Sequence, residues 1–525
     1  MPIRRIAEKT TGLLINIYLL LLLVVLPLYM ENGFVLIGDV KYYFFRDRTI
    51  LFVLLVSICA VFCLKSRDWR WSEVDIAVLS FAAASILSFC LSDDKRTAFW
   101  GYDDWYMGLL SQLLFVWIYF AVSRGYEGEK YIWETAGVGA VVVFTLGILN
   151  RLGYDPLKIY EGIGGIGIYA VIDDGNWIYE HMLSTIGNEN WYCGYASVAS
   201  GICLYYGYSQ SGWKRVIGLT ASLITFMTLL TQGSEAAYFI IFILFLLLLI
   251  VSLDKREQFL GFLNVLLLLP LSCVLLEIYD LMSTAGLQMN SDSTLESFIL
   301  FRGWGVILIL MAVFRIVEGI RERRGKRDYI REKPLRKAVF CVLICLMACG
   351  MVLLVLCQIS DKFWIMLGGS ELLRFSRSWG SYHGGLWYLS ILGWLESGWK
   401  EKVFGVGPDC FAVFLYSRFD VADFMAWAGL GETIYANAHN EWLNMLINEG
   451  IFGAVSYAAI FVCAFRRIWK NRAANGILLA ALLALGGYMI NGVFSFQQTI
   501  STPLIFAILG MAEAEIRSKT AVRQA

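Results

Sequence analysis

The chain has 525 residues, of which 58% are hydrophobic and only 16% are charged, and its formal net charge is zero. Soluble domains carry roughly a quarter charged residues, so this composition excludes an ordinary soluble protein that covers its surface with polar groups. The balanced charge gives no indication of a nucleic-acid partner. We therefore expect an all-α, polytopic membrane protein.

Apolar runs recur along the whole chain, and most are near the 20 residues that cross about 30 Å of hydrocarbon as a helix, while 216–231, 236–252 and 501–515 are shorter. We expect a bundle of about fourteen spans, at residues 12–30, 47–64, 75–92, 106–123, 133–150, 190–208, 216–231, 236–252, 259–278, 298–316, 338–357, 440–464, 476–497 and 501–515. The first run follows Arg4, Arg5 and Lys9 and lacks a small-residue cleavage site at its end. It is typical of an uncleaved first span.

Basic residues predict the orientation, because loops that stay in the cytoplasm carry an excess of Lys and Arg. With the N-terminus inside, the inner loops collect most of the basic residues, among them Lys65, Arg67, Arg70, Arg124, Lys130, Lys214, Arg215, Lys255, Arg256, the cluster from Arg321 to Lys337, Arg466, Arg467, Lys470 and Arg472. An even number of spans then places both termini in the cytoplasm.

The longest hydrophilic stretch, residues 358–438, precedes the twelfth span and is predicted to be a large extracytoplasmic loop. It is rich in Trp, Gly and Arg. The apolar pairs Leu386-Trp387, Ile391-Leu392 and Trp394-Leu395 recur in it at helical spacing. This pattern predicts a helix that lies on the membrane surface with its tryptophans at headgroup depth.

The segment that opens the twelfth span carries the strongest candidates for chemistry. A helix there would place Asn440, Asn444 and Asn448 on one face, which is costly in lipid and should face the protein interior or a wet cavity. Interhelical hydrogen bonding explains these amides as well as binding of sugar hydroxyls or phosphate does. His439 lies at the outer mouth of this face. Two of the chain's three histidines, His383 and His439, belong to the same region, which favours a functional role.

Arg374, Arg377 and Arg418 lie in the same loop, where positive charge is otherwise scarce. A guanidinium group matches phosphate oxygens, although snorkelling to lipid headgroups explains each arginine equally well. Arg302, inside the tenth predicted span, is a functional hypothesis by default because an intramembrane arginine is costly.

Metal binding is not expected. Outer acidic pairs such as Asp103-Asp104 could hold a hard cation, but adjacent carboxylates in a loop are usually only solvated. The cysteines show no CxxC or Cys/His spacing typical of zinc sites. We expect no metal and no other cofactor.

Several short motifs then support a family resemblance. Phe404-Gly405-Val406-Gly407-Pro408 in the outer loop, Ala438-His439-Asn440 opening a span, and Asn448-Glu449-Gly450-Ile451-Phe452-Gly453 after it occur in this order. Together with the earlier Ser184-Thr185-Ile186-Gly187-Asn188-Glu189-Asn190 and the closing Ser501-Thr502-Pro503-Leu504, this pattern resembles the O-antigen ligase and O-antigen polymerase family of bacterial membrane glycosyltransferases.

The resemblance implies both a division of the chain and an activity. Residues 184–515 would form the ligase-like or polymerase-like membrane region, after an N-terminal membrane region (1–183) and before a cytoplasmic tail (516–525). The enzyme would sit in the bacterial cytoplasmic membrane, among membrane lipids, and would take a glycan from undecaprenyl diphosphate. The acceptor would be a glycan, a lipid or a protein. His439 would act as base on the acceptor hydroxyl or hold the diphosphate.

Two positions depart from the family pattern. Many members carry an arginine four residues before the tryptophan of a Gly-Ser-x-Arg-x-x-x-Trp element, where this chain has His383 before Trp387, and many have Ser-Arg where this chain has Ser234-Glu235. Arg302, Arg374 or Arg377 would then have to neutralise the charge of the diphosphate. His383, Asn440 and Asn444 would complete the substrate site. The alternatives are a flippase or other transporter of lipid-linked oligosaccharides, and a non-catalytic envelope scaffold.

Overall fold

The computed structural model describes residues 2–63, 70–160, 181–283, 286–287, 294–324, 333–369, 373–380, 383–419, 434–472 and 476–524. These residues are mostly helical, and six of the helices are long and apolar enough to cross a membrane. They are Arg4–Leu28, Glu73–Leu91, Lys130–Arg151, Gly212–Thr231, Arg256–Met282 and Glu441–Asn471. Each of the fourteen predicted segments contains a helix, while the number that cross a membrane stays a prediction.

The first half of the chain contains α1 (Pro2–Leu20), a π-helical turn η1 (Leu21–Val25), α2 (Leu26–Leu28), α3 (Ile37–Cys63), α4 (Glu73–Leu91), α5 (Lys95–Trp100), α6 (Leu109–Gly125), α7 (Lys130–Arg151), α9 (Glu189–Ser209), α10 (Gly212–Thr231) and α11 (Ala236–Ser252). A short antiparallel hairpin of β1 (Met182–Leu183) and β2 (Gly187–Asn188) precedes α9.

The second half contains α12 (Arg256–Leu266), α13 (Leu268–Met282), α14 (Thr294–Ile299), α15 (Trp304–Arg323), α16 (Lys333–Ile359), α17 (Asp361–Met366), α18 (His383–Glu396), α19 (Trp399–Phe404), α20 (Phe411–Arg418), α22 (Glu441–Asn471), α23 (Ile477–Asn491) and α24 (Thr502–Gln524). A helix, α18, is present where the surface helix is predicted, while its position at a membrane surface stays a prediction. α24 runs on to Gln524, through the residues assigned from the sequence to a tail.

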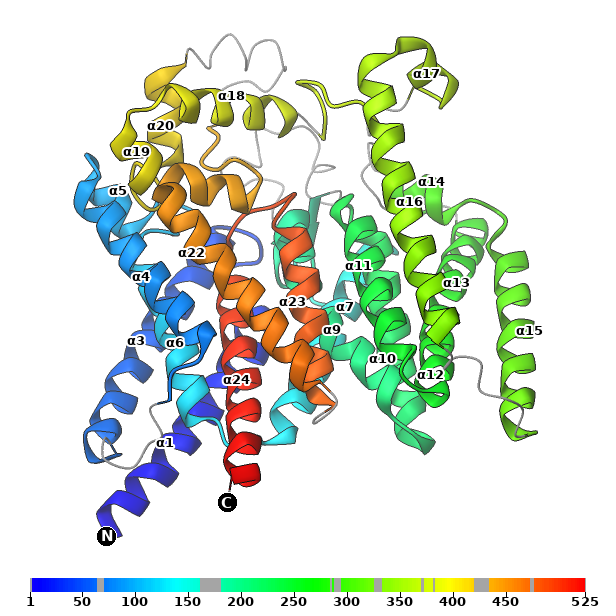
Figure 1. Cartoon of the computed structure of the whole chain (residues 1–525), viewed down its shortest axis with the longest axis horizontal. Coiled ribbons are helices and arrows are strands. Elements are labelled where there is room, and N and C mark those ends of the chain that lie inside the picture. The colour runs from blue at the N-terminus through cyan, green and yellow to red at the C-terminus, as the bar shows by residue number, and fades with distance from the viewer. Residues whose placement is uncertain are drawn as a thin grey trace.

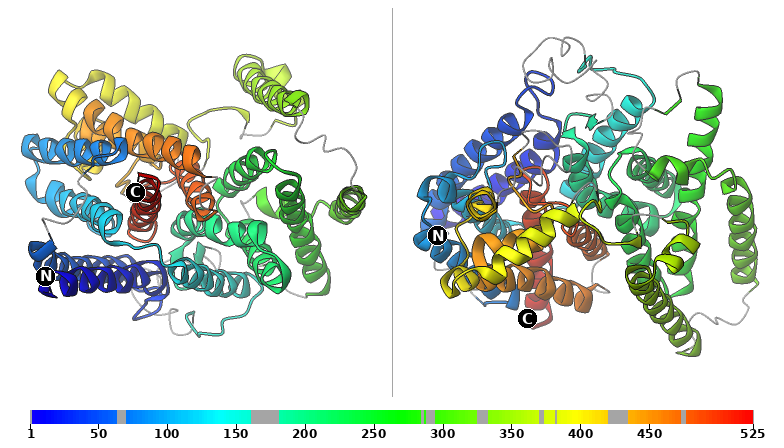
Figure 2. Two further views of the ribbon diagram at one scale, coloured as in Figure 1. Left: turned by 60° about the horizontal axis from the view of Figure 1, so that its bottom comes forward. Right: turned by 90° about the horizontal axis from the view of Figure 1, so that it is seen from above.

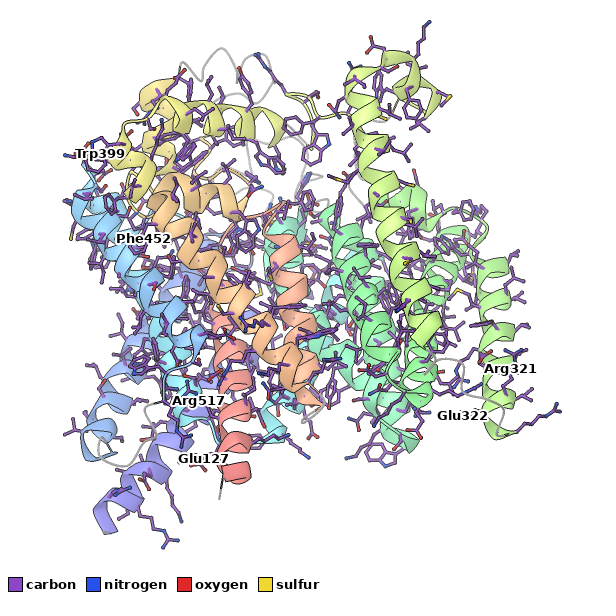
Figure 3. The ribbon with its side chains drawn as sticks, in the orientation of Figure 1. Glu127, Arg321, Glu322, Trp399, Phe452 and Arg517 are labelled. Atoms are coloured by element: carbon purple, nitrogen blue, oxygen red, sulfur yellow. The ribbon has the colours of Figure 1, made fainter. Side chains whose placement is uncertain are left out.

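Long helices run between the two ends of the molecule, which we name by what they carry (Figure 1). The loop end holds α18, α19 and α20, which lie across the bundle, and the terminal end holds both chain ends. Figure 3 places Trp399 near the loop end and Glu127, Arg517, Arg321 and Glu322 towards the terminal end. This arrangement agrees with the uneven distribution of basic residues in the sequence.

The buried centre of the molecule consists of α9, α23 and the first part of α24. α24 is surrounded by other helices when the molecule is seen along the bundle (Figure 2). Glycines bring α9 and α23 into backbone contact, because a Cβ on Gly201 would lie 2.3 Å from the amide nitrogen of Ala484 and one on Gly487 would lie 2.2 Å from the carbonyl oxygen of Ser197. Small residues at such contacts permit close packing without a hydrophobic driving force.

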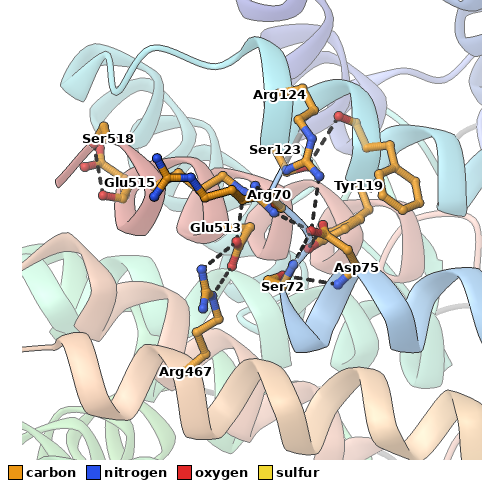
Figure 4. Close-up of polar contacts among 12 residues, drawn as sticks. Arg70, Ser72, Asp75, Tyr119, Ser123, Arg124, Arg467, Glu513, Glu515 and Ser518 are labelled. Atoms are coloured by element: carbon orange, nitrogen blue, oxygen red, sulfur yellow. Dashed lines mark hydrogen bonds and ion pairs between the residues drawn. The ribbon is translucent and has the colours of Figure 1, made fainter. Parts of the chain in front are cut away.

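An ionic network holds four helices together near the terminal end (Figure 4). Asp75 of α4 is fully buried and accepts hydrogen bonds from Arg517 of α24, from Arg124 (3.1 Å) and from the Tyr119 hydroxyl (2.9 Å). Glu513 joins Arg517 (2.9 Å) to Arg467 of α22 (2.5 Å). A buried carboxylate is tolerated here because several cationic donors meet its charge.

We predict that Asp75→Ala destabilises the protein strongly, because the largely buried Arg124 and Arg517 lose the carboxylate that compensates their charge. The expected loss is about 3–5 kcal/mol, measured as thermal or denaturant unfolding of the purified protein. Glu73→Ala is the matched control on the same helix, since the Glu73–Arg466 pair is solvent-exposed and such pairs contribute about 0–1 kcal/mol. Equal losses in the two variants would contradict the assignment.

Candidate functional site

A strained turn leads into α22 and carries His439. The φ of His439 is +47°, in the left-handed region that non-glycine residues rarely adopt. Three asparagine side chains hold this turn: Asn437 accepts from the His439 amide (3.0 Å), Asn444 accepts from the Ala438 amide (3.2 Å), and Asn440 caps α22 by accepting from the Leu443 amide (2.9 Å). Strain of about 1–3 kcal/mol held by surrounding contacts is typical of functional sites.

The turn is covered by the beginning of α18, and this brings the two candidate histidines together. The His383 ring stacks on the His439 ring with centroids 4.4 Å apart. The indole N–H of Trp387, one helical turn along α18, donates to the Ala438 carbonyl at 3.1 Å. α18 is therefore fixed to the start of α22 by a hydrogen bond beside the stacked imidazoles.

Aromatic side chains surround the histidine pair. The Phe496 ring meets His439 edge-on at 5.2 Å, and Trp379 lies 5.3 Å from Trp387 and 6.3 Å from Phe494. Phe494 and Phe496 belong to the linker between α23 and α24. The sequence gives no sign that these phenylalanines belong to the site, because they lie within the predicted span 476–497, whereas α23 ends at Asn491.

Both imidazoles are neutral at physiological pH. Burial lowers the pKa of His383 to about 4, and burial together with the neighbouring His383 lowers the pKa of His439 well below its usual value. Among the described residues, the Nδ1 atom of His439 is buried and has no hydrogen-bond partner, while His383 and His439 are each partly exposed as whole residues. His439 can therefore accept a proton, whereas His383 cannot supply a positive charge at neutral pH.

A buried polar network supports the first turn of α22. The Glu441 carboxylate accepts from the Tyr488 hydroxyl (2.8 Å) and from the Tyr457 hydroxyl, and its amide donates to the Gly492 carbonyl (2.7 Å). The amide of Gln497 donates to the Tyr457 hydroxyl (3.1 Å). These bonds join the start of α22 to α23 and to the linker that carries Phe496. They therefore fix the segment that follows His439 and the segment whose Phe496 ring contacts it.

Two glycine motifs from the sequence interlock on α22. The helix breaks at Gly450, where φ is +68°, and a break leaves carbonyls without helical partners. The Val406 and Gly407 amides donate to the Ile447 (3.2 Å) and Asn448 (2.9 Å) carbonyls. A Cβ on Gly450 would lie 2.4 Å from the Val403 backbone, so only glycine permits this approach.

The interlocked segment continues into a buried aspartate that holds another loop. Asp409 accepts from the Tyr102 and Met107 amides, each at 2.8 Å, and thereby fixes residues 101–107, which join α5 to α6. Within that loop, Trp105 meets Phe496 at 4.6 Å. Phe496 therefore contacts both Trp105 and His439. The sequence does not predict this proximity, because more than three hundred residues separate Trp105 from His439.

The predicted arginines do not gather around the histidines. Arg302 has a φ of +62° and lies between α14 and α15, where its amide donates to Glu277 of α13. The tenth predicted span is therefore broken at this arginine, and α13–α15 lie across the molecule from α18 (Figures 1 and 2). Arg374 pairs with Asp361 (2.6 Å). Arg377 is exposed over the Tyr388 ring at 5.6 Å, and among the described residues it forms no ion pair.

The Arg377 backbone nevertheless lies beside the histidine site. Its carbonyl accepts from the Gly385 amide at 3.0 Å, and the Trp379 carbonyl accepts from the Gly384 amide at 3.0 Å. Both donors directly follow His383 in α18. Of the three predicted arginines, Arg377 is the one whose backbone contacts the helix turn that carries a site histidine.

The Ser184–Asn190 motif builds structure around α7 and α9. Ser184 has a φ of +54° and closes the turn of the β1–β2 hairpin, where its amide donates to Asn150 and its hydroxyl donates to the Val143 carbonyl, each at 2.8 Å. Asn188 caps α9 by accepting from the Asn190 amide (2.9 Å).

Within the described part of the chain, no three His, Cys, Asp or Glu side chains form a group that could hold a metal ion.

We predict that Asp409 contributes less to the folding stability of the protein as pH rises. Burial raises the pKa of Asp409 to about 7 against the two amide donors that lower it, so the folded state binds a proton that the unfolded state releases near pH 4. Stability from this group is present below pH 4 and is lost as pH rises through 7. In thermal unfolding, Asp409→Asn should lie close to the natural protein at about pH 4, exceed it by a growing margin as pH rises to 7, and keep that margin at pH 8. An offset that does not change with pH would contradict this account.

Comparison with known proteins adds no assignment to this geometry. No protein-family model matches the chain, and no curated protein matches it either. The similarity to O-antigen ligases and polymerases therefore stays a prediction that depends on short motifs. Three of these motifs do lie together in the structure. The turn at His439 leads into α22, Gly450 breaks the same helix, and the Val406 and Gly407 amides donate to α22 carbonyls just before the break.

Proposed function

We propose that the protein transfers a glycan from an undecaprenyl-diphosphate carrier to a glycan, lipid or protein acceptor, as a polysaccharide polymerase or ligase of the bacterial cytoplasmic membrane. The observation that carries this proposal is the stacked His383–His439 pair on a strained turn at the loop end of the bundle. The proposal also places about fourteen spans in the membrane, with the loop end outside and both termini in the cytoplasm.

His439 acts as the general base. Its neutral imidazole takes the proton from an acceptor hydroxyl as the acceptor oxygen attacks C1 of the donor sugar. The bond between C1 and the diphosphate oxygen breaks, and the diphosphate leaves with the bonding electrons. A lowered pKa weakens a base but keeps it unprotonated, and the fixed position of the ring raises its efficiency.

The leaving diphosphate needs positive charge, and Arg377 is the best-placed source. Arginine neutralises phosphate oxygens through parallel hydrogen bonds and remains charged at every relevant pH. His383 is neutral, Arg374 is engaged by Asp361, and Arg302 lies with α13–α15. His383 then serves to orient His439 by stacking, and the exposed Arg377 side chain turns towards the carrier when it binds.

The asparagines have a positioning role in this proposal. The side-chain oxygens of Asn440 and Asn444 are already bonded to backbone amides of the turn, so their first effect is to hold His439 in its strained conformation. Their amide N–H groups are donors that remain available to sugar or phosphate oxygens at the mouth of the site.

We predict that His439→Ala abolishes transfer while the protein stays folded. Loss of a positioned general base costs about 10²–10⁴-fold in rate, measured with purified protein in nanodiscs supplied with an undecaprenyl-diphosphate oligosaccharide and an acceptor. His181→Ala is the matched control, since His181 is the third histidine of the chain and lies outside the site. Undiminished transfer in folded His439→Ala would contradict the proposal. In cells, loss of the transferase leaves the carrier-linked glycan on the outer leaflet, whereas loss of a flippase would leave it on the inner leaflet.

We further predict that Arg377→Gln weakens use of the diphosphate donor more than Arg374→Gln does. The two substitutions remove the same charge from the same segment, but Arg374 is held in an exposed pair with Asp361. Arg377→Gln should lower kcat/KM for the carrier-linked donor by about tenfold or more, because a charge-assisted hydrogen bond contributes about 1.5–3 kcal/mol. An equal effect of the two variants would assign no special role to Arg377.

A further inference from the structure

A polar cleft of about 690 Å³ lies at the loop end, beside the loop that Asp409 holds. Its walls come from the N-terminal part of α3, from α5 and from residues 101–106, and they include Tyr43, Trp100 and Tyr102. A second cleft of about 440 Å³ continues on the other side of Tyr43. The volume of the first cleft falls within the range of roughly 300–1,000 Å³ typical of ligand sites.

The aromatic side chains of the cleft offer exposed faces. Trp100 is 49% exposed and Tyr43 is 42% exposed. The Arg46 guanidinium lies over the Tyr43 ring, 4.7 Å from its centroid, so Trp100 offers the more open face. Pyranose rings present C–H groups with partial positive charge, and these fit the negative faces of aromatic rings. The arrangement therefore suits flat, hydroxyl-bearing rings.

The charged residues of the cleft favour an uncharged ligand over a phosphate. The cleft walls contain two arginines, Arg46 and Arg96, and three aspartates, Asp94, Asp103 and Asp104. The Asp94 carboxylate caps α5 by accepting from the Arg96 and Thr97 amides. Arg46 is also bonded to Asp47 at 2.8 Å. A phosphate group would meet a net acidic wall, whereas sugar hydroxyls can donate to the carboxylates and accept from the guanidinium groups.

The cleft is coupled to the histidine site through one loop. Tyr102 and Tyr106 line the cleft, and between them Trp105 contacts Phe496, which contacts His439. Tyr106 is held by stacking on Tyr42 with centroids 4.2 Å apart. Asp409 fixes both ends of the same loop, so a chain bound in the cleft would keep a constant relation to His439.

We propose that this cleft binds the acceptor as a chain of sugars, with Trp100 as the stacking face and Asp103, Asp104 and Arg96 as partners of the hydroxyls. The assignment rests on the proposed glycan transfer and narrows its acceptor from glycan, lipid or protein to glycan. The donor diphosphate binds elsewhere, near Arg377, because the cleft is acidic.

The test is direct binding of a sugar chain to the full-length protein in nanodiscs. The probe is a mixture of short, fluorescently labelled oligosaccharides released by mild acid from the surface polysaccharide of cells that express the protein, and the readout is fluorescence anisotropy. Trp100→Ala should weaken binding about tenfold, because a stacking contact is lost. Trp399→Ala is the matched control, since Trp399 is also exposed (68%) and lies near the same end but outside the cleft.

Parallel transfer assays separate the two proposals. His439→Ala should bind the oligosaccharides like the natural protein and fail to transfer, whereas Trp100→Ala should raise the KM for acceptor with little change in kcat. Unchanged binding in Trp100→Ala, equal weakening in Trp399→Ala, or no binding by the natural protein would overturn the cleft assignment and leave glycan transfer intact. Normal transfer by His439→Ala, with binding lost in Trp100→Ala, would overturn the transfer mechanism and leave a glycan-binding cleft.

Discussion

The loop end of the molecule depends on the contact between the Val403–Gly407 backbone and the break in α22. The break at Gly450 exposes helix carbonyls, and the amides of Val406 and Gly407 satisfy them. The segment continues to Asp409, which accepts hydrogen bonds from the loop between α5 and α6. This contact and the Trp105–Phe496 contact together place the 101–107 loop relative to His439.

The electrostatics of the site follow from its burial. Two neutral imidazoles stack without repulsion because burial lowers the pKa of both, and the aromatic rings around them exclude charge. Under the proposed glycan transfer, this environment would separate the base from the arginine that neutralises the leaving group. The proposal then has donor and acceptor approach His439 from different sides, the donor beside Arg377 and the acceptor from the acidic cleft.

Hydropathy was sufficient to predict a helix in each of the fourteen apolar segments, and helical spacing was sufficient to predict α18, whereas short helices such as α5, α17, α19 and α20 carry no such signal. The approach of His383 to His439 agrees with their common loop. Long-range contacts were out of reach: nothing local to Trp105 or Phe496 indicates that they meet, and the role of the glycines emerges only when Gly405 and Gly450 are seen against each other's backbone. Arg302 appeared to be an intramembrane charge because the apolar run does not show the break between α14 and α15.

The most direct test of the account is to locate the carrier's diphosphate on the protein. A photo-crosslinking analogue of the lipid-linked donor, with a diazirine on the sugar next to the diphosphate, can be bound to the protein in nanodiscs and its attachment mapped by peptide mass spectrometry. The account predicts labelling at the start of α18 and in residues 434–444, and loss of that labelling when excess unlabelled donor competes. Labelling confined to α12–α15, or to the terminal end, would contradict the assignment of the histidine pair as the reaction site.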